Sequence, residues 1–246
     1  MKHSHWQLYF GLSLVAISAF LYFIHYEVFR DAHHVYIFLL GDIAFVPIEV
    51  LLVTLIFHRV LGEREKNTVM KKLNMVIGAF FSEVGTNLLQ HFSHFDCHFD
   101  KIRENLVVMN SWSEQKFIST SKSLKSFDYS MDSQKGNLEE LRNFLIEKRD
   151  FLLRLLENPN LLEHESFTEL LWAVSHLTEE LAARADVRKL SNADYAHLSS
   201  DIERAYMVLI CEWLEYMRHL KAEYPYLFSF ALRTNPFDPN ATPEIR

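Results

Sequence analysis

The sequence predicts an all-α protein in which a two-helix transmembrane hairpin is followed by a cytoplasmic antiparallel helical bundle. Two apolar stretches near the N-terminus are each long enough to cross a bilayer. Beyond Phe57 the apolar residues recur at helical spacing among charged residues, which is typical of soluble amphipathic helices. Capping residues and short links separate these later segments, and short links favour antiparallel neighbours.

Composition narrows the function classes. The 246 residues carry a net charge of −7, which argues against a nucleic-acid partner because such proteins present a basic face. Only six glycines are present, and neither a glycine-rich phosphate loop nor a Gly-x-Ser-x-Gly elbow occurs. The sequence therefore favours a protein that is not an enzyme. Cys97 and Cys211 lie too far apart in sequence to form a disulfide framework, which favours a reducing compartment.

The first predicted span covers about residues 6–28 of a hairpin that extends over residues 1–60. Its basic start and the small-x-small pattern Ala16–Ser18 would also suit a signal peptide. A cleavable peptide should turn polar after that pattern, whereas this apolar run continues through Phe23. We therefore expect a retained transmembrane helix.

The second predicted span covers about residues 35–57, and the charges around it set the orientation. The loop between the spans has one basic residue, Arg30, whereas several follow the second span: Arg59, Arg64, Lys66, Lys71 and Lys72. An excess of Lys and Arg marks the cytoplasmic side. The sequence thus predicts a multi-pass protein of the cell (inner) membrane with both termini in the cytoplasm.

Two carboxylates lie inside this second span. Asp42 and Glu49 are seven residues apart, which places them on one helix face about 10 Å apart. Each would cost roughly 2.5–3.5 kcal/mol at the centre of a bilayer. Pro47 lies between them and lacks an N–H, so a kink is expected. The two carboxylates and the backbone carbonyl that Pro47 leaves without a hydrogen bond form the predicted polar stripe.

Several interpretations of the stripe stay open. Asp42 could lie near the outer interface, and Glu49 could be protonated or bonded to Ser13, Ser18 or Thr54 as packing glue. Alternatively, both acids could line a path for ions. Because one hairpin cannot enclose two acids, either interpretation favours a homo-oligomer.

Residues 61–110 are expected to form a connector and a long amphipathic helix, residues 111–223 the bundle, and residues 224–246 an extended tail. Bundle helices are expected to open at Asn137, at the capping box that begins with Ser166, and at Ser191. The tail contains four prolines, and its apolar segment 226–232 could dock on the bundle, the membrane or another subunit.

Two histidine-containing sets are candidate metal ligands, although no cofactor is required by the sequence. His91, His94 and His98 follow i, i+3, i+7 spacing and would share one face of a continuous helix. The second set comes from two later helices: His176, Glu180, His197 and Asp201. For both sets the simpler interpretation is a polar or ion-paired helix surface, with Arg184, Arg204 and Arg218 at helical spacing from the later acids.

Three functions follow as hypotheses. The first is an oligomeric ion-conducting or ion-regulated membrane protein with Asp42 and Glu49 along the path. The second is a membrane-tethered helical scaffold whose bundle binds a cytoplasmic protein partner. The third is a membrane-anchored helical bundle that binds a divalent metal ion. In all three hypotheses the hairpin lies in the lipid bilayer. In the first, Asp42 and Glu49 line the ion path, whereas in the second they hold the assembled helices together.

Overall fold

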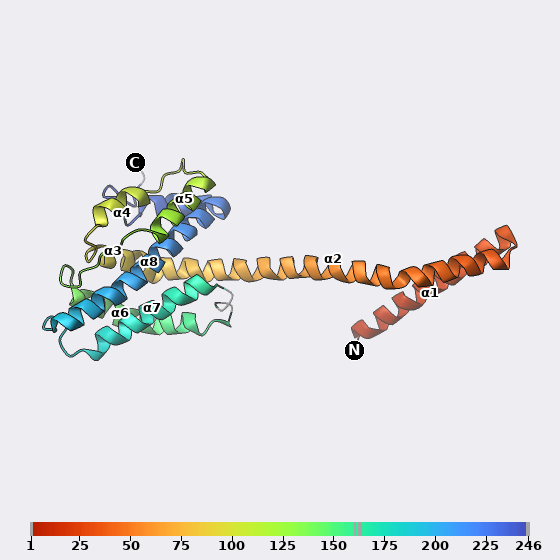
Figure 1. Ribbon diagram of the computed structural model, residues 1–246, viewed down its shortest axis with the longest axis horizontal. Coiled ribbons are helices and arrows are strands. Elements are labelled where there is room, and N and C mark those ends of the chain that lie inside the picture. Colours follow the sequence, from red (N-terminus) through yellow and green to blue (C-terminus); the bar gives the residue numbers. More distant parts are fainter. Residues whose placement is uncertain (1, 160, 162–163, 245–246) are drawn as a thin grey trace. The chain divides into compact units, whose positions relative to one another are not determined.

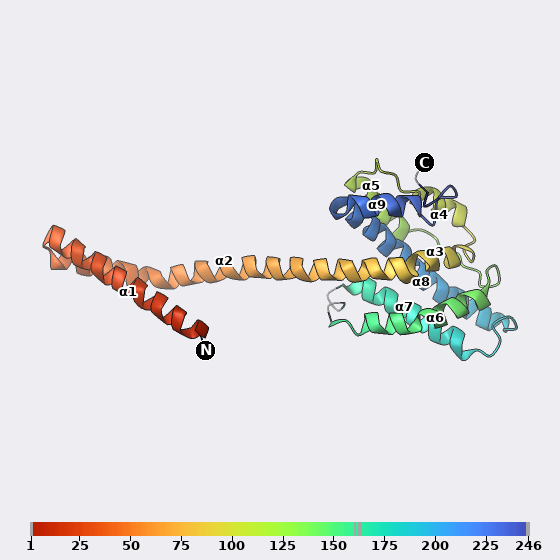
Figure 2. The same cartoon turned by 180° about the vertical axis from the view of Figure 1, so that it is seen from behind.

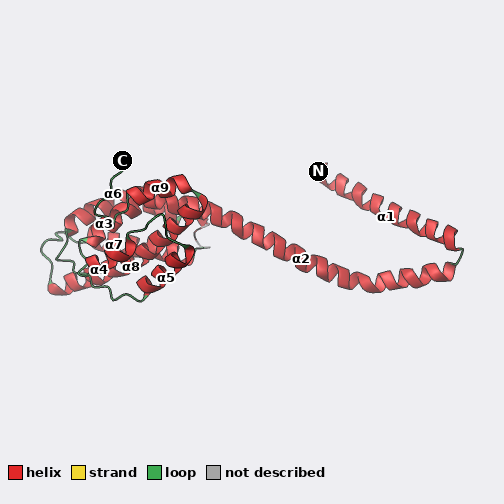
Figure 3. Cartoon of the chain, turned by 90° about the horizontal axis from the view of Figure 1, so that it is seen from above, coloured by secondary structure: helices red, strands yellow, loops and turns green. Residues whose placement is uncertain are grey.

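The computed structural model describes residues 2–159, 161 and 164–244 (Figure 1). Their regular secondary structure is helical, and the one isolated β-bridge joins Asp96 to Met131 (Figure 3). The chain divides into two units, Met1–Lys66 and Asn67–Arg246. The predicted class is confirmed: two apolar helices are followed by a helical bundle.

The first unit is a helical hairpin. Helix α1 spans Lys2–Phe29, and helix α2 begins at Ala32 and runs to Phe80 in the second unit. Arg30 has a φ of 53°, and its N–H donates to the carbonyl of Tyr26 at 2.8 Å, which ends α1. Asp31 opens α2, because its carboxylate accepts from the N–H of His33 at 2.9 Å. The link is therefore only two residues long.

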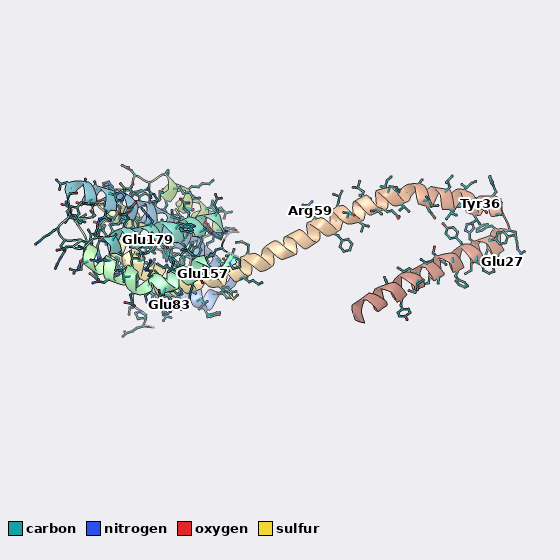
Figure 4. All side chains as sticks on the ribbon, turned by 90° about the horizontal axis from the view of Figure 1, so that it is seen from below. Glu27, Tyr36, Arg59, Glu83, Glu157 and Glu179 are labelled. Atoms are coloured by element: carbon teal, nitrogen blue, oxygen red, sulfur yellow. The ribbon has the colours of Figure 1, made fainter. Side chains whose placement is uncertain are left out.

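The hairpin exposes its apolar side chains. The windows Tyr9–Phe29 and Ala32–Phe57 have no buried residue, and in Figure 4 their side chains project outward on both helices, with Glu27 and Tyr36 near the turn. Length and composition suit two membrane spans. A signal sequence near the N-terminus would meet the same criteria, so these helices are candidate spans.

The second unit is built around one long helix, α8, which spans Asn192–Glu223. Several elements pack against α8: helices α5, α7 and α9, the π-helical turn, and helix α3, which follows that turn (Figure 2). Helix α6 packs against α7. The other elements of this unit are the π turn Phe81–Gly85, α3 Thr86–Ser93, α4 Phe99–Leu106, α5 Glu114–Lys125, α6 Leu138–Leu156, α7 Glu165–Ala183 and α9 Pro225–Arg233.

Apolar residues at helical spacing build the core of this unit. Leu198, Ile202, Ala205 and Leu209 of α8 are fully buried at intervals of three or four residues. The end of α2 and the elements after it follow the predicted pattern, with these residues buried: Leu73, Ile77, Phe80, Val84, Leu88 and Phe92. Burial of each such side chain contributes roughly 1.5–3 kcal/mol.

The helix starts test the predicted caps. The Asn137 side chain accepts from the N–H of Glu140 at 3.1 Å, and Ser191 accepts from Asp194 at 3.1 Å, as expected. The prediction of a capping box that begins with Ser166 is wrong. Helix α7 begins one residue earlier, and the ring of His164 accepts from the N–H of Phe167 at 3.2 Å.

Two predicted segments differ from the structure. The long amphipathic helix stops at Ser93, because the Asp96 carboxylate accepts from the N–H of His98 at 2.7 Å and competes with helix continuation. The tail is not wholly extended, since Pro225 begins α9. Proline suits a first helical position, where no N–H is needed, and Phe228 is buried on the bundle.

Candidate functional site

The polar residues of the hairpin are only partly brought together. The Tyr22 hydroxyl on α1 donates to the Asp42 carboxylate on α2 at 2.6 Å, so Asp42 has a partner within its own hairpin. Ser13 donates instead to the carbonyl of Phe10 at 2.7 Å. Glu49 has no hydrogen bond or ion pair to any side chain that the structure describes. The sequence did not single out Tyr22 as this partner.

Helix α2 continues through Pro47 without interruption. The proline stays inside the helix, between the two acids, as the sequence indicates. The expected kink and the roles of Asp42, Pro47 and Glu49 in an ion path or in assembly remain predictions.

The first histidine set loses the geometry on which its prediction relied. His91 lies in α3 and its ring packs on Phe144 at 4.9 Å, whereas His94 follows the end of α3 and His98 precedes α4. Because the helix ends at Ser93, the three imidazoles do not share a helical face. Burial also lowers the pKa of His91, because it disfavours the charged imidazolium.

The second set does come together. Helices α7 and α8 form an antiparallel pair joined by a link of eight residues, and His176 and Glu180 near the end of α7 meet His197 and Asp201 near the start of α8. Among the residues that the structure describes, His176, Glu180 and His197 form the one group whose ligand atoms all lie within 4.8 Å of one another.

The distances define a compact cluster around the two imidazoles. His197 Nε2 lies 3.3 Å from Asp201 Oδ2 and 3.6 Å from Glu180 Oε2, and His176 Nε2 lies 3.6 Å from Asp201 Oδ2. The Asp201 side chain is 3% exposed, whereas the imidazoles of His176 and His197 are 46% and 49% exposed. The cluster thus has a buried carboxylate beneath two accessible imidazoles.

Two arginines border this cluster. Arg184 Nη1 lies 2.6 Å from Glu180 Oε2, and its Nη2 lies 3.2 Å from Asp194 Oδ1. The hydrogen bond from Arg184 holds the pKa of Glu180 below its usual range. Arg204 reaches only Oδ1 of Asp201, at 3.5 Å. The predicted ion pairs of Arg184 and Arg204 are therefore present beside the candidate metal ligands.

A cavity of about 690 Å³ with a mixed polar and apolar lining lies elsewhere in the second unit. Residues from the end of α2, from α5, from the start of α7 and from α8 line it, including Asn74, Lys125, His164, Glu212 and His219. Glu212 is 5% exposed, and burial raises the pKa of its carboxyl. The sequence pattern could not reveal this cavity, because four segments distant in sequence form it.

The comparisons with known proteins follow the same division of the chain. Residues 2–61 match the family described as "MJ1433, N-terminal helical domain", and residues 69–233 match "Uncharacterized protein MJ1433, C-terminal helical domain". The chain belongs to the MJ1433 family. A relative from Methanocaldococcus jannaschii, "Uncharacterized protein MJ1433", is 44% identical over 238 residues, covering 97% of this chain and 96% of the relative. No solved structure matches the chain.

Proposed function

We propose that this chain is an integral membrane protein whose N-terminal hairpin holds a helical binding domain at the cytoplasmic face of the membrane. One observation carries the proposal: two apolar windows of 21 and 26 residues have no buried residue, whereas the second unit has its own apolar core. In water such an apolar surface would drive association, and in a bilayer it is solvated by lipid.

The domain acts in this proposal as a membrane-tethered interaction module. Its cavity of about 690 Å³ falls within the size range of sites for small ligands or partner side chains. Glu212 gives that cavity a buried carboxyl group, whose pKa is raised by burial. These features support binding, and neither requires a chemical reaction.

The orientation can be tested with the two native cysteines. Cys97 is exposed, whereas burial raises the pKa of the Cys211 thiol to about 11 and slows its reaction with maleimides. With the domain in the cytoplasm, a membrane-impermeant maleimide should label Cys97 only after the membrane is permeabilised. Cys97→Ser provides the control for specificity. Labelling of Cys97 in intact cells would contradict the orientation.

A second candidate function is ion passage through a homo-oligomer, and Glu49 is the observation that favours it. Asp42 bonds to Tyr22, but Glu49 lacks a partner among the side chains described for the hairpin. An unpaired carboxylate inside a span costs several kcal/mol unless another subunit or water solvates it. In an oligomer with second spans facing inward, Glu49 would form a ring that attracts cations.

The two uses of Glu49 differ in their response to Glu49→Gln. If Glu49 lines an ion path, the variant should change cation flux into liposomes while the oligomer in detergent keeps its mass. If Glu49 is assembly glue, the same substitution should dissociate the oligomer. A wild-type protein that is monomeric in detergent and conducts no ions would rule out this second function and leave the tethered module.

A further inference from the structure

Helices α7 and α8 present two matched pairs of potential ligands to each other. His176 and Glu180 are four residues apart on α7, and His197 and Asp201 are four residues apart on α8, so each pair lies on one helix face. In the antiparallel arrangement each imidazole of one helix faces a carboxylate of the other. Such crossed pairs bring two nitrogen and two oxygen ligands together where the two helices face each other.

The spacing of the ligand atoms suits a metal ion. Zinc binds imidazole nitrogen and carboxylate oxygen at about 2.0–2.2 Å, so two ligand atoms of a tetrahedral site lie about 3.3–3.6 Å apart. The three nitrogen–oxygen distances of the cluster are 3.3, 3.6 and 3.6 Å. These three pairs already have the separation of neighbouring zinc ligands, and His176, Glu180 and His197 also lie within 4.8 Å of one another.

A second observation points to a missing partner inside the cluster. The Asp201 side chain is only 3% exposed, and its Oδ2 atom makes no hydrogen bond. This oxygen is the atom that faces both His176 Nε2 and His197 Nε2. A buried carboxylate oxygen without a partner is costly, and a cation bound between it and the imidazoles would remove that cost.

The bordering arginines leave this oxygen free. Arg204 approaches the other oxygen of Asp201, and Arg184 bonds to Glu180 at the edge of the cluster. The hydrogen bond from Arg184 would orient Glu180 as a ligand, as residues behind metal ligands commonly do. Arg184 contacts the same Oε2 atom of Glu180 that faces His197, whereas neither arginine contacts Oδ2 of Asp201.

We propose that His176, His197 and Asp201 bind one divalent transition-metal ion of the zinc class, with Glu180 as the fourth ligand. Imidazole and carboxylate together favour zinc and its neighbours over magnesium or calcium, which take oxygen ligands. Four protein ligands close a tetrahedral site, so the ion clamps α7 to α8 rather than activating a water molecule. This proposal concerns the second unit and is independent of the membrane function.

The test uses the full chain in detergent, stripped of metal with a chelator and titrated with Zn²⁺ against a chromophoric indicator. One Zn²⁺ per chain is expected, with affinity reduced at least about tenfold in His176→Ala and in Asp201→Asn. Glu179→Gln is the matched control, because this exposed carboxylate is adjacent to Glu180 but lies about 100° around α7. It should bind Zn²⁺ as the wild type does.

Misfolding of a variant must be separated from loss of a ligand. Circular dichroism of the stripped proteins checks helix content, and Glu180→Gln offers a milder change that preserves side-chain shape. Cobalt substitution adds a direct readout: visible absorption bands expected for the wild type should shift in Glu180→Gln and disappear in His197→Ala. Wild-type protein that binds no Zn²⁺, or binding unchanged by all of the ligand substitutions, would overturn the proposal.

Discussion

Gly85 closes the π-helical turn, where the backbone passes close to two buried rings. A Cβ at this position would lie 2.5 Å from a ring carbon of Phe81 and 2.8 Å from one of Phe80. Both rings are buried and have little room to move. Gly85→Ala should therefore lower the free energy of unfolding by about 1–3 kcal/mol.

Gly78 in the last turns of α2 provides the comparison for this prediction. Its added Cβ would meet Tyr216 at an ordinary distance of 3.7 Å. Gly78→Ala should be neutral or stabilise by up to about 1 kcal/mol, because alanine is the better helix former. Thermal unfolding followed by circular dichroism measures the stability of both variants. A Gly85→Ala variant as stable as the wild type would contradict the predicted clash with the rings of Phe80 and Phe81.

Glu212 makes the stability of the domain depend on pH. Burial raises its folded-state pKa above the ordinary value of 4.5, so the folded chain holds this proton more tightly than the unfolded chain. Its contribution is favourable below the ordinary pKa and is lost as the pH rises through the raised value. Glu212→Gln should remove that loss, and its advantage over the wild type should grow from pH 4 to pH 8.

Chemical unfolding across that pH range tests the Glu212 prediction. The exposed Glu104 supplies the control, since Glu104→Gln should follow the wild-type profile. A Glu212→Gln variant whose stability parallels the wild type at every pH would show that burial of this carboxyl has no energetic consequence.

At the scale of elements, the hairpin depends on a contact between its two helices. Tyr22 and Asp42 form the hydrogen bond between α1 and α2, close enough at 2.6 Å to be strong in an apolar setting. Tyr22→Phe should destabilise the hairpin by about 1–2 kcal/mol. Tyr36→Phe is the control, because Tyr36 is 70% exposed.

A double-mutant cycle gives the sharper form of this test. Tyr22→Phe and Asp42→Asn should each destabilise the protein in detergent, and the double variant should cost less than the two changes added together. Additive effects would show that the two side chains do not interact in the folded protein.

Apolar periodicity and capping residues predicted some of the helices better than others. The amphipathic helix expected within residues 61–110 has its buried face from Leu73 to Phe92, and Asn137 and Ser191 marked real helix starts. The break after Ser93 depends on the Asp96 side chain and on a bridge to Met131, a contact distant in sequence. Helix α9 was missed because the four prolines of the tail favoured an extended chain, whereas Pro225 occupies the first position of a helix.

The candidate sites show the same limit. Spacing within one helix identified His176 with Glu180 and His197 with Asp201, but only the antiparallel packing of α7 on α8 brings the pairs together. The same type of argument placed His91, His94 and His98 on one face, and there the helix ended too early. The Tyr22 partner of Asp42 required knowledge of how α1 lies along α2.

At the scale of the whole molecule, the two units differ in where their apolar residues lie. The second unit buries most of its large apolar residues in a core of its own, while the hairpin leaves both apolar windows exposed. The family matches also separate at residues 61 and 69, near the division at Lys66 and Asn67. The second unit thus has a buried apolar core, whereas the two helices of the hairpin are candidate membrane spans.

Membrane flotation tests the insertion of the hairpin most directly. Membranes from cells that express the full chain are washed with alkaline carbonate, which removes peripheral proteins, and are then floated on a density gradient, which leaves aggregates behind. We predict that the full-length chain, uncleaved, stays with the floating lipid. Release of the chain by carbonate, or recovery of a shortened chain that lacks the hairpin in the soluble fraction, would contradict a membrane-anchored protein.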